Sequence, residues 1–587
     1  MTDRDPAARP AAFTHPEPAP PPNFEIAAEP ELVLVRSTRR FDRDDIVMRK
    51  AEYALRNGHQ TPQESMLEDL LAIRRVLDDA GIAHLLVRGD GGRPVIAVDR
   101  AQRKALARAF AEAFADEPFY SAPIAPKKAK DTVPVLLADG QLAAHRKASA
   151  FRLYRPRIEP LGRLRYGKET AVQLELWRFG DEVIEAPLPN AVMRTTLPRG
   201  EAVEESVERY GTTWTTLEHM WEPLASDIDF DIDLVFSWVD GSSDEFRRER
   251  AKRMQSYVVG DGDDSEARYR QIDELKYALR SVYLFAPWVR RIFIATDSPA
   301  PAWLADHPRV RIVRSEEFFS DPEALPTHNS HAVESRLHHI EGLAEHFLYS
   351  NDDMFFGRPV SPDLFFSPGG ITKFVEAGTR IGLGESAPER SGFENAARVN
   401  RALLRARFGK VTTRHLEHCA APLRRSVMRE LEQTFPDEFR RTARAQFRSA
   451  TDISVTNSLY HYYALMTGKA VVQQQARVQY IETTLQRALP AMERLLKRRD
   501  RDMFCLNDGS RPEIPVDVRT SAVTEFLERY FPFPAPWEKP VPGAQGPAGA
   551  QGPAGAPESA GARGFAGVPG VTDGPGFADA TGAGSAR

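Results

Sequence analysis

The chain is poor in cysteine and has no long apolar segment. Its 587 residues contain only Cys419 and Cys505, too few for a disulfide framework or a four-thiolate zinc site. We therefore expect a reducing, cytoplasmic setting. No apolar run reaches the roughly eighteen residues that a membrane-spanning helix needs, and the first residues lack the apolar core of a secretory signal. Any membrane association is therefore expected to be peripheral, through partners.

An excess of charge of one sign is also missing. Lys and Arg number 78 against 83 Asp and Glu, which gives a net charge of −5. This balance excludes a general nucleic-acid binder, which would carry a strongly basic surface. Apolar residues make up 42% of the chain, enough for complete cores, and the length predicts two or three domains.

Composition divides the chain into five parts. The tail has Gly at every third position for several triplets, the period of a collagen triple helix, so a flexible tail and a trimerising tail both stay open. The parts are a Pro/Ala-rich leader (1–40), a small α+β domain (41–190), a connecting stretch (191–227), a domain with chemical motifs (228–535) and a Gly/Pro/Ala-rich tail (536–587).

The small domain mixes helical and alternating patterns. Apolar residues at helical spacing predict helices over 66–81 and 101–115. Two short apolar runs flank Gly91-Gly92, which predicts a strand pair with a turn there. No group of residues in this domain points to a chemical role. Further strands are expected within 133–139, 150–156 and 170–186.

Acidic residues follow buried-looking strands in the domain at 228–535. The apolar run 232–239 ends at Asp240-Gly241, and the run 292–296 ends at Asp297. A helix over 272–284 separates the two runs. Continuous apolar strands are typical of parallel sheets, whose ligand crevice opens at the carboxyl ends of the strands. We predict an α/β domain with a mainly parallel, Rossmann-like sheet, similar to nucleotide-sugar transferases, with a helical C-terminal region closing over the crevice.

A more specific signal is Asn351-Asp352-Asp353, which lies between two apolar runs. Adjacent carboxylates repel each other unless a cation compensates, and Mg²⁺ or Mn²⁺ takes oxygen ligands of this type. Asn507-Asp508 repeats the pattern after another apolar run. A solvated acidic turn is the plain alternative. Glu334 and His338, four residues apart on a helix, offer half of a zinc site without a third ligand close by in sequence.

The helical region adds a cation and several histidines. Arg448 precedes a Ser/Thr/Asp cluster typical of a helix start, a good position for binding phosphate. His418 titrates near neutral pH and could serve as general base or nucleophile, although a lone histidine is often structural. The choice among His415, His418 and His461 stays open at this stage.

Four segments in this order resemble the Stealth family, which is similar to the catalytic subunit of animal GlcNAc-1-phosphotransferase. Bacterial members act on capsular or cell-wall polysaccharide. The resemblance covers residues 228–510, about half of the chain, with long strings agreeing in order. The segments equated with the four conserved regions are 233–244, 273–304, 329–357 and 418–468.

The resemblance implies a reaction. A sugar-1-phosphate would move from a nucleotide-sugar donor, UDP-linked, to a hydroxyl of a glycan acceptor that can be lipid-linked, releasing UMP at the inner face of the membrane. Two alternatives stay open: a metal-dependent glycosyltransferase, which would release UDP, and a non-enzymatic surface or scaffold protein that uses its collagen-like tail to oligomerise.

The resemblance also implies roles for individual side chains. Asp352 and Asp353 would hold Mg²⁺ or Mn²⁺, Arg448 would bind the diphosphate, and His418 would be the base or nucleophile. The full set comprises metal ligands (Asp352, Asp353, Asp508), catalytic groups (His418, Arg448, Asp297, Glu274) and substrate-binding groups (Trp238, Asp240, Gly241, Arg280, Asn329, His331, Glu334).

Overall fold

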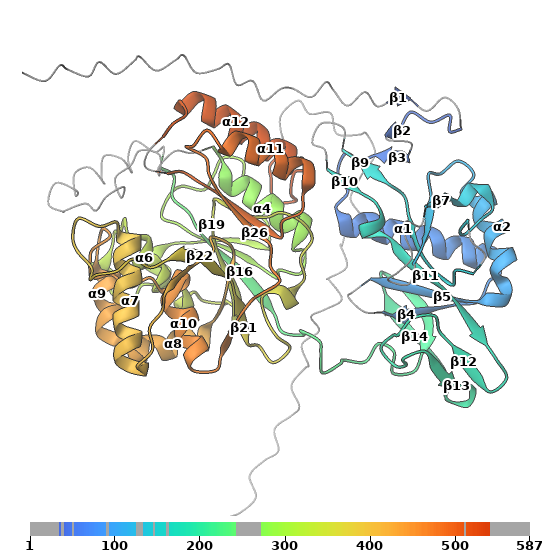
Figure 1. The fold of residues 1–587 in the computed structure, drawn as a ribbon, viewed down its shortest axis with the longest axis horizontal. Helices are drawn as coiled ribbons and strands as arrows, with labels where there is room; N and C mark the ends of the chain where they lie inside the picture. Colours follow the sequence, from blue (N-terminus) through green and yellow to red (C-terminus); the bar gives the residue numbers. More distant parts are fainter. Residues whose placement is uncertain are drawn as a thin grey trace, which may run out of the picture.

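A five-stranded sheet organises the second half of the molecule, and a separate α+β body lies beside it (Figure 1). Most of the predicted leader, the Gly91-Gly92 turn and the Gly-rich tail after residue 540 lie outside the described residues. The structure, a computed structural model, describes residues 35–36, 40–49, 52–89, 93–124, 133–144, 147–159, 164–241, 272–509 and 512–540.

The main sheet has the order β18-β17-β16-β19-β24. Its first four strands are parallel and β24 is antiparallel to β19. The central strand is fully buried at Leu234 and Val235, because helices cover both faces of the sheet. The predicted α/β class is confirmed. The strands are β16 (Ile232–Ser237), β17 (Ile292–Ala295), β18 (Val310–Val313), β19 (His346–Asn351) and β24 (Ala421–Arg424).

The predicted helix over 272–284 is observed as α4 (Glu274–Phe285). Its apolar stripe, with Leu279 and Val282 fully buried, packs over a second, smaller sheet. In this sheet β20 is antiparallel and β26 parallel to β27. Two further helices lie on the same side as α4 (Figure 1). These elements are β20 (Met354–Phe356), β26 (Val478–Glu482), β27 (Met503–Asn507), α11 (Ala488–Arg498) and α12 (Val516–Tyr530).

The helical region lies on the opposite face of the main sheet (Figure 1). Val235 and Phe347 point into this second core, where they share one apolar cluster with the helices. A π-helix, Val455–Leu459, precedes α10. The other elements are α5 (Ser315–Phe318), α6 (Ser330–Glu334), β21 (Thr372–Phe374), β22 (Glu376–Arg380), α7 (Gly392–Phe408), β23 (Arg414–Leu416), α8 (Arg425–Thr434), α9 (Pro436–Arg444), α10 (Tyr460–Met466) and β25 (Ala470–Val472).

The N-terminal body is an α+β domain built on a mixed sheet, as expected. Strands β4 and β5 form the predicted antiparallel pair, and β5 runs parallel to the central β11. Residues 137–139 form a 3₁₀ turn instead of continuing the predicted strand. The main elements are β2 (Ile46–Arg49), β3 (Glu52–Arg56), α1 (Pro62–Asp79), β4 (His84–Arg88), β5 (Pro94–Asp99), α2 (Arg103–Ala113), β6 (Tyr120–Pro123), β7 (Val135–Leu136), β8 (Ala150–Tyr154), β9 (Arg157–Ile158), β10 (Arg165–Tyr166), β11 (Val172–Phe179) and β12 (Val183–Glu185).

The connecting stretch 191–227 differs from its prediction. It holds β13 (Thr196–Pro198) and a hairpin of β14 (Glu204–Arg209) and β15 (Thr212–Leu217). The hairpin is anchored because Trp214 is buried in the N-terminal core. Its other residues are mostly exposed threonines and glutamates, which conceal the strand pattern in the sequence.

The two bodies share part of their core. Leu164 and Tyr166 of the N-terminal domain are buried in the same apolar cluster as α4, α11 and α12. The Tyr283 hydroxyl of α4 donates a hydrogen bond to Glu64 of α1 at 3.3 Å. Among the described helices, none is long and apolar enough to cross a membrane.

Asp233 fixes the start of the central strand. Its carboxylate is fully buried and accepts hydrogen bonds from Arg290 at 2.6 and 2.8 Å. It also accepts from the backbone N–H of Ala344 at 2.7 Å and of Arg291 at 3.2 Å. The carboxylate therefore joins β16 to the loops that precede β17 and β19.

We expect Asp233→Ala to destabilise this sheet by about 3 kcal/mol, because it leaves a cation and buried N–H groups without their acceptor. Hydrogen exchange of peptides from β16 and β19 measures the loss. Asp231→Ala is the matched control: Asp231 also pairs with Arg290 at 2.8 Å but is 42% exposed, so about 0–1 kcal/mol is expected. Equal effects of the two substitutions would contradict this role of Asp233.

Candidate active site

Three carboxylates lie near one another at the carboxyl edge of the main sheet, close enough for their charges to interact. Asp352 and Asp353 form the turn between β19 and β20, and Glu274 begins α4. Burial, together with the charges of Asp353 and Glu274, raises the pKa of Asp352 well above its usual range. The fold therefore holds like charges together in a partly buried corner, called here the acidic corner.

The acidic corner is braced from the small sheet. The Cys505 thiol donates a hydrogen bond to Asp353 Oδ2 at 3.4 Å, and the backbone N–H of Leu506 donates to the Asp353 carbonyl at 3.0 Å. Burial and the nearby Asp353 charge raise the pKa of the Cys505 thiol well above its usual range, so the thiol remains a neutral donor.

The chemistry of the corner fits a hard divalent cation. Mg²⁺ and Mn²⁺ prefer carboxylate oxygens, and a cation would relieve the repulsion that raises the pKa of Asp352. Asp508 lies differently: its carboxylate accepts a hydrogen bond from Thr483 and lies 3.6 Å from Arg519. The structure thus brings Glu274 beside Asp352 and Asp353, whereas Asp508 engages the side that carries α12.

Arg448 and His418 form the basic side of the crevice. Arg448 Nη2 donates to the Ser330 hydroxyl at 2.8 Å. Its stem passes so close to Gly392 that a Cβ added there would lie 2.8 Å from Arg448 Cβ. Burial, followed by the charges of His415 and Arg448, lowers the pKa of His418 below its ordinary value. His418 is therefore neutral at neutral pH, as a base or nucleophile must be.

The geometry separates the three candidate histidines. His461 is fully buried, donates through Nε2 to the Thr456 carbonyl at 2.8 Å, and has its pKa lowered by burial to about 4. The His415 ring stacks on Phe393 at 4.6 Å. His418 is partly exposed and lies beside Arg448, so it is the best placed of the three to meet a phosphate.

Glu334 is part of a buried hydrogen-bond network. It accepts from the Tyr349 hydroxyl at 3.2 Å and from the Thr456 hydroxyl, in the π-helix, at 2.6 Å. His338 instead contacts Glu432 at 2.8 Å, so the structure does not join Glu334 and His338 into a zinc pair. Within the described ranges, the set of three such groups whose ligand atoms all lie within 4.8 Å of one another is His338, His339 and Glu432; the carboxylates of the acidic corner are not that close together.

Asn329 and His331 hold the turn that follows Arg448. Asn329 Nδ2 donates to Asp452 Oδ2 at 2.8 Å, and His331 Nδ1 lies 3.7 Å from the same oxygen. The backbone N–H of Ser449 also donates to it, at 3.0 Å. The two residues predicted to bind substrate therefore act on the position of Arg448 in this structure.

Arg280 and Trp238 lie in packed surroundings. Arg280 donates to both oxygens of Glu538 at 2.7 Å and to the Phe531 carbonyl at 3.0 Å. Trp238 is 7% exposed and belongs to the core cluster around α4. The structure does not bring either side chain to an open surface of the crevice.

Two more predicted residues lie at strand ends with backbone contacts. The Asp297 carboxylate accepts from the N–H of Ser315 at 2.8 Å, at the start of α5. The N–H of Asp240, which precedes Gly241, donates to the Ser298 hydroxyl at 2.8 Å. The first contact ties the end of β17 to α5, and the second ties the ends of β16 and β17 together at the carboxyl edge of the sheet.

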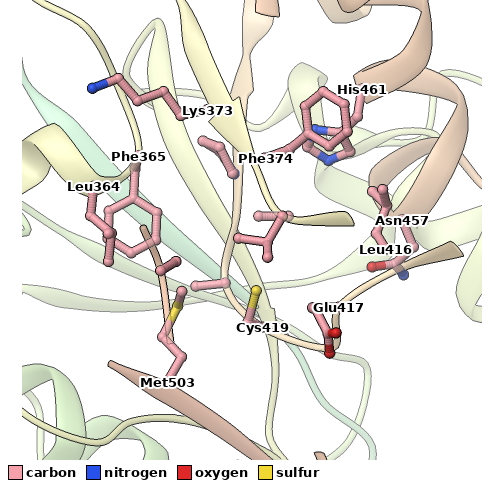
Figure 2. Close-up of a pocket in the computed structure, with 15 residues that line it drawn as sticks. Leu364, Phe365, Lys373, Phe374, Leu416, Glu417, Cys419, Asn457, His461 and Met503 are labelled. Atoms are coloured by element: carbon pink, nitrogen blue, oxygen red, sulfur yellow. The ribbon is translucent and has the colours of Figure 1, made fainter. Parts of the chain in front are cut away.

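Sequence reasoning missed residues on the small sheet. Tyr480 of β26 lies next to His418, with ring centroids 5.4 Å apart. A pocket adjoins this place and is lined by Glu417 and Cys419, the two chain neighbours of His418, and by Met503 of β27 (Figure 2). The alternation of β26 could have suggested which of its side chains face the crevice, but the strand lies outside the motifs considered.

Four family models match the chain. They describe Stealth protein conserved regions 1 to 4, over residues 230–258, 268–374, 417–465 and 493–546. The region boundaries expected from the sequence need correction. The segments 273–304 and 329–357 both belong to region 2, the segment 418–468 corresponds to region 3, and region 4 includes Asn507-Asp508 with α12.

Among solved structures, the chain matches a galactosyltransferase, LgtC, in complex with donor and acceptor sugar analogs. The match has a TM-score of 0.26 and 13% identity, covering 52% of this chain and 96% of that one. We draw nothing from a likeness of this strength.

Full-length relatives are much more similar. "Exopolysaccharide phosphotransferase CpsY" of Mycobacterium tuberculosis is 58% identical over 494 residues, covering 84% of this chain and 92% of that one. The protein of the same name in Mycobacterium leprae is 56% identical over 504 residues (86% and 92%). "Exopolysaccharide phosphotransferase" of Nocardia farcinica is 52% identical over 482 residues (82% and 89%). With such identity over most of both chains, this chain belongs to the Stealth family and is a phosphotransferase enzyme.

Proposed function

We propose that the protein transfers a sugar-1-phosphate from a UDP-sugar to a hydroxyl of a glycan acceptor, forming a phosphodiester and releasing UMP. The relatives' name, exopolysaccharide phosphotransferase, supports the class of acceptor. The observation that carries the proposal is that Tyr480 adjoins both the acidic corner and the basic side of the crevice: its ring contacts His418, which lies near Arg448, and the charge of Asp353 acts on its hydroxyl.

The acidic corner would hold a divalent cation through Asp352 and Asp353, with Glu274 beside them. When bound, such an ion supplies positive charge that neutralises the diphosphate of the donor. Asp508 would not be one of these ligands, since Thr483 and Arg519 engage its carboxylate.

Arg448 would hold the diphosphate through its guanidinium fork, a geometry suited to phosphate oxygens. The acceptor oxygen attacks the phosphorus that carries the sugar. A new P–O bond forms to the acceptor, and the P–O bond to the bridging oxygen breaks, so UMP leaves with that oxygen. His418 takes the proton of the acceptor hydroxyl or, as nucleophile, first accepts the sugar-phosphoryl group on a ring nitrogen.

The remaining assignments follow from this chemistry. A lipid-linked glycan would present its hydroxyl at the cytoplasmic face of the membrane, where nucleotide-sugar donors are made. The protein would reach that face through its substrate or a partner. Fractionation of cells with and without the glycan carrier tests this location.

Purified protein with Mg²⁺, a panel of UDP-sugars and soluble glycan acceptors should release UMP, measured by chromatography. EDTA should abolish the release. Asp353→Asn should lower kcat by about 10³-fold or more, because a carboxylate that faces the diphosphate charge is lost. Asp437→Asn, at a side chain that is 78% exposed, is the control and should leave the rate unchanged. Release of UDP would mean glycosyl transfer and would contradict the proposal.

The pH dependence of kcat/KM should report the protonation of the His418 ring. Activity requires the neutral ring, and burial lowers the pKa of His418 below 6.5, so protonation sets in only at more acidic pH. We expect kcat/KM to be flat down to about pH 6.5 and to fall below it. His418→Gln should remove this acidic limb together with most of the activity. A limb centred above pH 6.5 in the parent protein would argue against His418.

Gly392→Ala should displace Arg448, because the new methyl group would lie 2.8 Å from its Cβ and Cδ atoms. Gly392 is the first residue of α7 and alanine favours helix, which offsets part of the cost of the clash with Arg448 Cβ, so the variant should fold with a lowered melting temperature. The expected result is an increase of at least about tenfold in the donor KM, or about 1.4 kcal/mol. Gly378→Ala, where no atom lies within 4 Å of the added Cβ, is the matched control. Unchanged donor KM would show that Arg448 does not bind the donor.

A further inference from the structure

One face of the small sheet looks onto the acidic corner. In the parallel pairing of β26 with β27, Tyr480 lies beside Cys505 and Glu482 beside Asn507. Residues two apart on a strand point to the same side, so these four side chains share one face. The Cys505 thiol donates to Asp353 and the Tyr480 ring contacts His418, so this face adjoins both the acidic corner and the segment between β23 and β24 that carries His418.

Tyr480 is held in a defined position on this wall. Asn507 Nδ2 donates a hydrogen bond to its hydroxyl oxygen at 2.6 Å. Its ring meets the His418 ring edge to face, with centroids 5.4 Å apart and an interplanar angle of 72°. Even so, 43% of the residue is exposed. The aromatic ring is therefore fixed at both ends and still presents open surface.

The Tyr480 hydroxyl can also donate a hydrogen bond to a ligand. Partial burial and the nearby charges of Glu482 and Asp353 raise the pKa of this hydroxyl above its usual range, so it stays protonated. The oxygen accepts the bond from Asn507. No residue within the described ranges receives the phenol's own proton, which is thus available to a ligand.

A fixed, exposed aromatic ring with a free O–H suits a pyranose. The C–H face of a sugar packs on the ring, and a sugar hydroxyl or ring oxygen accepts the phenol proton, which uses both the apolar body and the polar tip of tyrosine. The donor and acceptor of the reaction both contain sugars. Their positions differ, because the donor diphosphate belongs with Arg448 and the cation, whereas the acceptor hydroxyl belongs with His418.

We propose that Tyr480 is the platform on which the acceptor sugar lies, with its reactive hydroxyl directed to His418. This rests on the proposed function, in which His418 deals with the acceptor. The contact between the Tyr480 and His418 rings places the two groups within the span of one sugar residue.

Tyr480 lies outside the matched conserved regions, so we expect it to contribute to the choice of acceptor sugar. β26 spans Val478–Glu482 and falls between conserved region 3, which ends at 465, and conserved region 4, which begins at 493. The acidic corner, His418 and Arg448 all lie inside matched regions. The acceptor platform is therefore supplied by a part of the chain that the family's common regions leave out.

Steady-state kinetics of Tyr480→Ala tests the proposal. We expect the acceptor KM to rise by about tenfold or more, while the donor KM and the acceptor-independent release of UMP stay within about twofold of the parent. Tyr480→Phe keeps the ring and should lose only the hydrogen-bond part of the effect. Gln479→Ala, on the opposite face of the same strand, is the matched control and should change neither KM.

Other outcomes overturn the proposal. If Tyr480→Ala raises the donor KM and leaves the acceptor KM unchanged, the ring serves the donor sugar. If the parent protein releases no UMP from any UDP-sugar, the proposed function fails, and the platform is then tested by binding alone. Saturation-transfer NMR with soluble glucose, mannose and N-acetylglucosamine oligosaccharides should give a signal in the parent protein that Tyr480→Ala loses. An equal signal in both proteins would exclude Tyr480 as a sugar platform.

Discussion

The repulsion among three carboxylates in the acidic corner is the constraint around which the crevice is built. Asp352 and Asp353 sit where the main sheet passes into the small sheet, and Glu274 opens a helix whose apolar stripe is fully buried. Burial and like charge raise the pKa of Asp352, so the folded chain is less stable there than it could be. Rigid elements on three sides keep the groups from moving apart, which is how proteins retain strain at functional sites.

The position of Arg448 likewise depends on the secondary structure around it. Arg448 immediately precedes a turn fixed by Asp452, and Asp452 is itself held by Asn329 at the start of α6. Glu334, at the end of α6, binds Thr456 of the π-helix. π-helical turns are rare and are frequent at functional sites. Here the turn connects the helical region to the edge of the main sheet, so the position of the cation depends on packing well away from the phosphate it would bind.

Much of this could be read from the sequence, and the exceptions have physical reasons. Fully buried parallel strands leave unbroken apolar runs, so the sheet and the polar residues at its edge were predictable. The partner of an individual polar side chain could not be predicted, because tertiary contacts decide it. Arg280 pairs with Glu538, 258 positions away, and Asp297 caps α5. The hairpin at 204–217 was missed because only Trp214 and a few neighbours anchor it. Tyr480 carried no motif, and its proximity to His418 follows from strand pairing alone.

The shared core of the two bodies has a consequence for how the chain is made. Tyr166 packs with residues of α11 and α12, and its hydroxyl senses the charge of Arg499, which is synthesised far later. At about 5–20 residues per second the delay is roughly 20 to 60 seconds. During that interval Leu164 and Tyr166 lack the apolar partners that bury them in the finished protein. The core of the N-terminal domain is therefore complete only after the last helices of the second body have been synthesised.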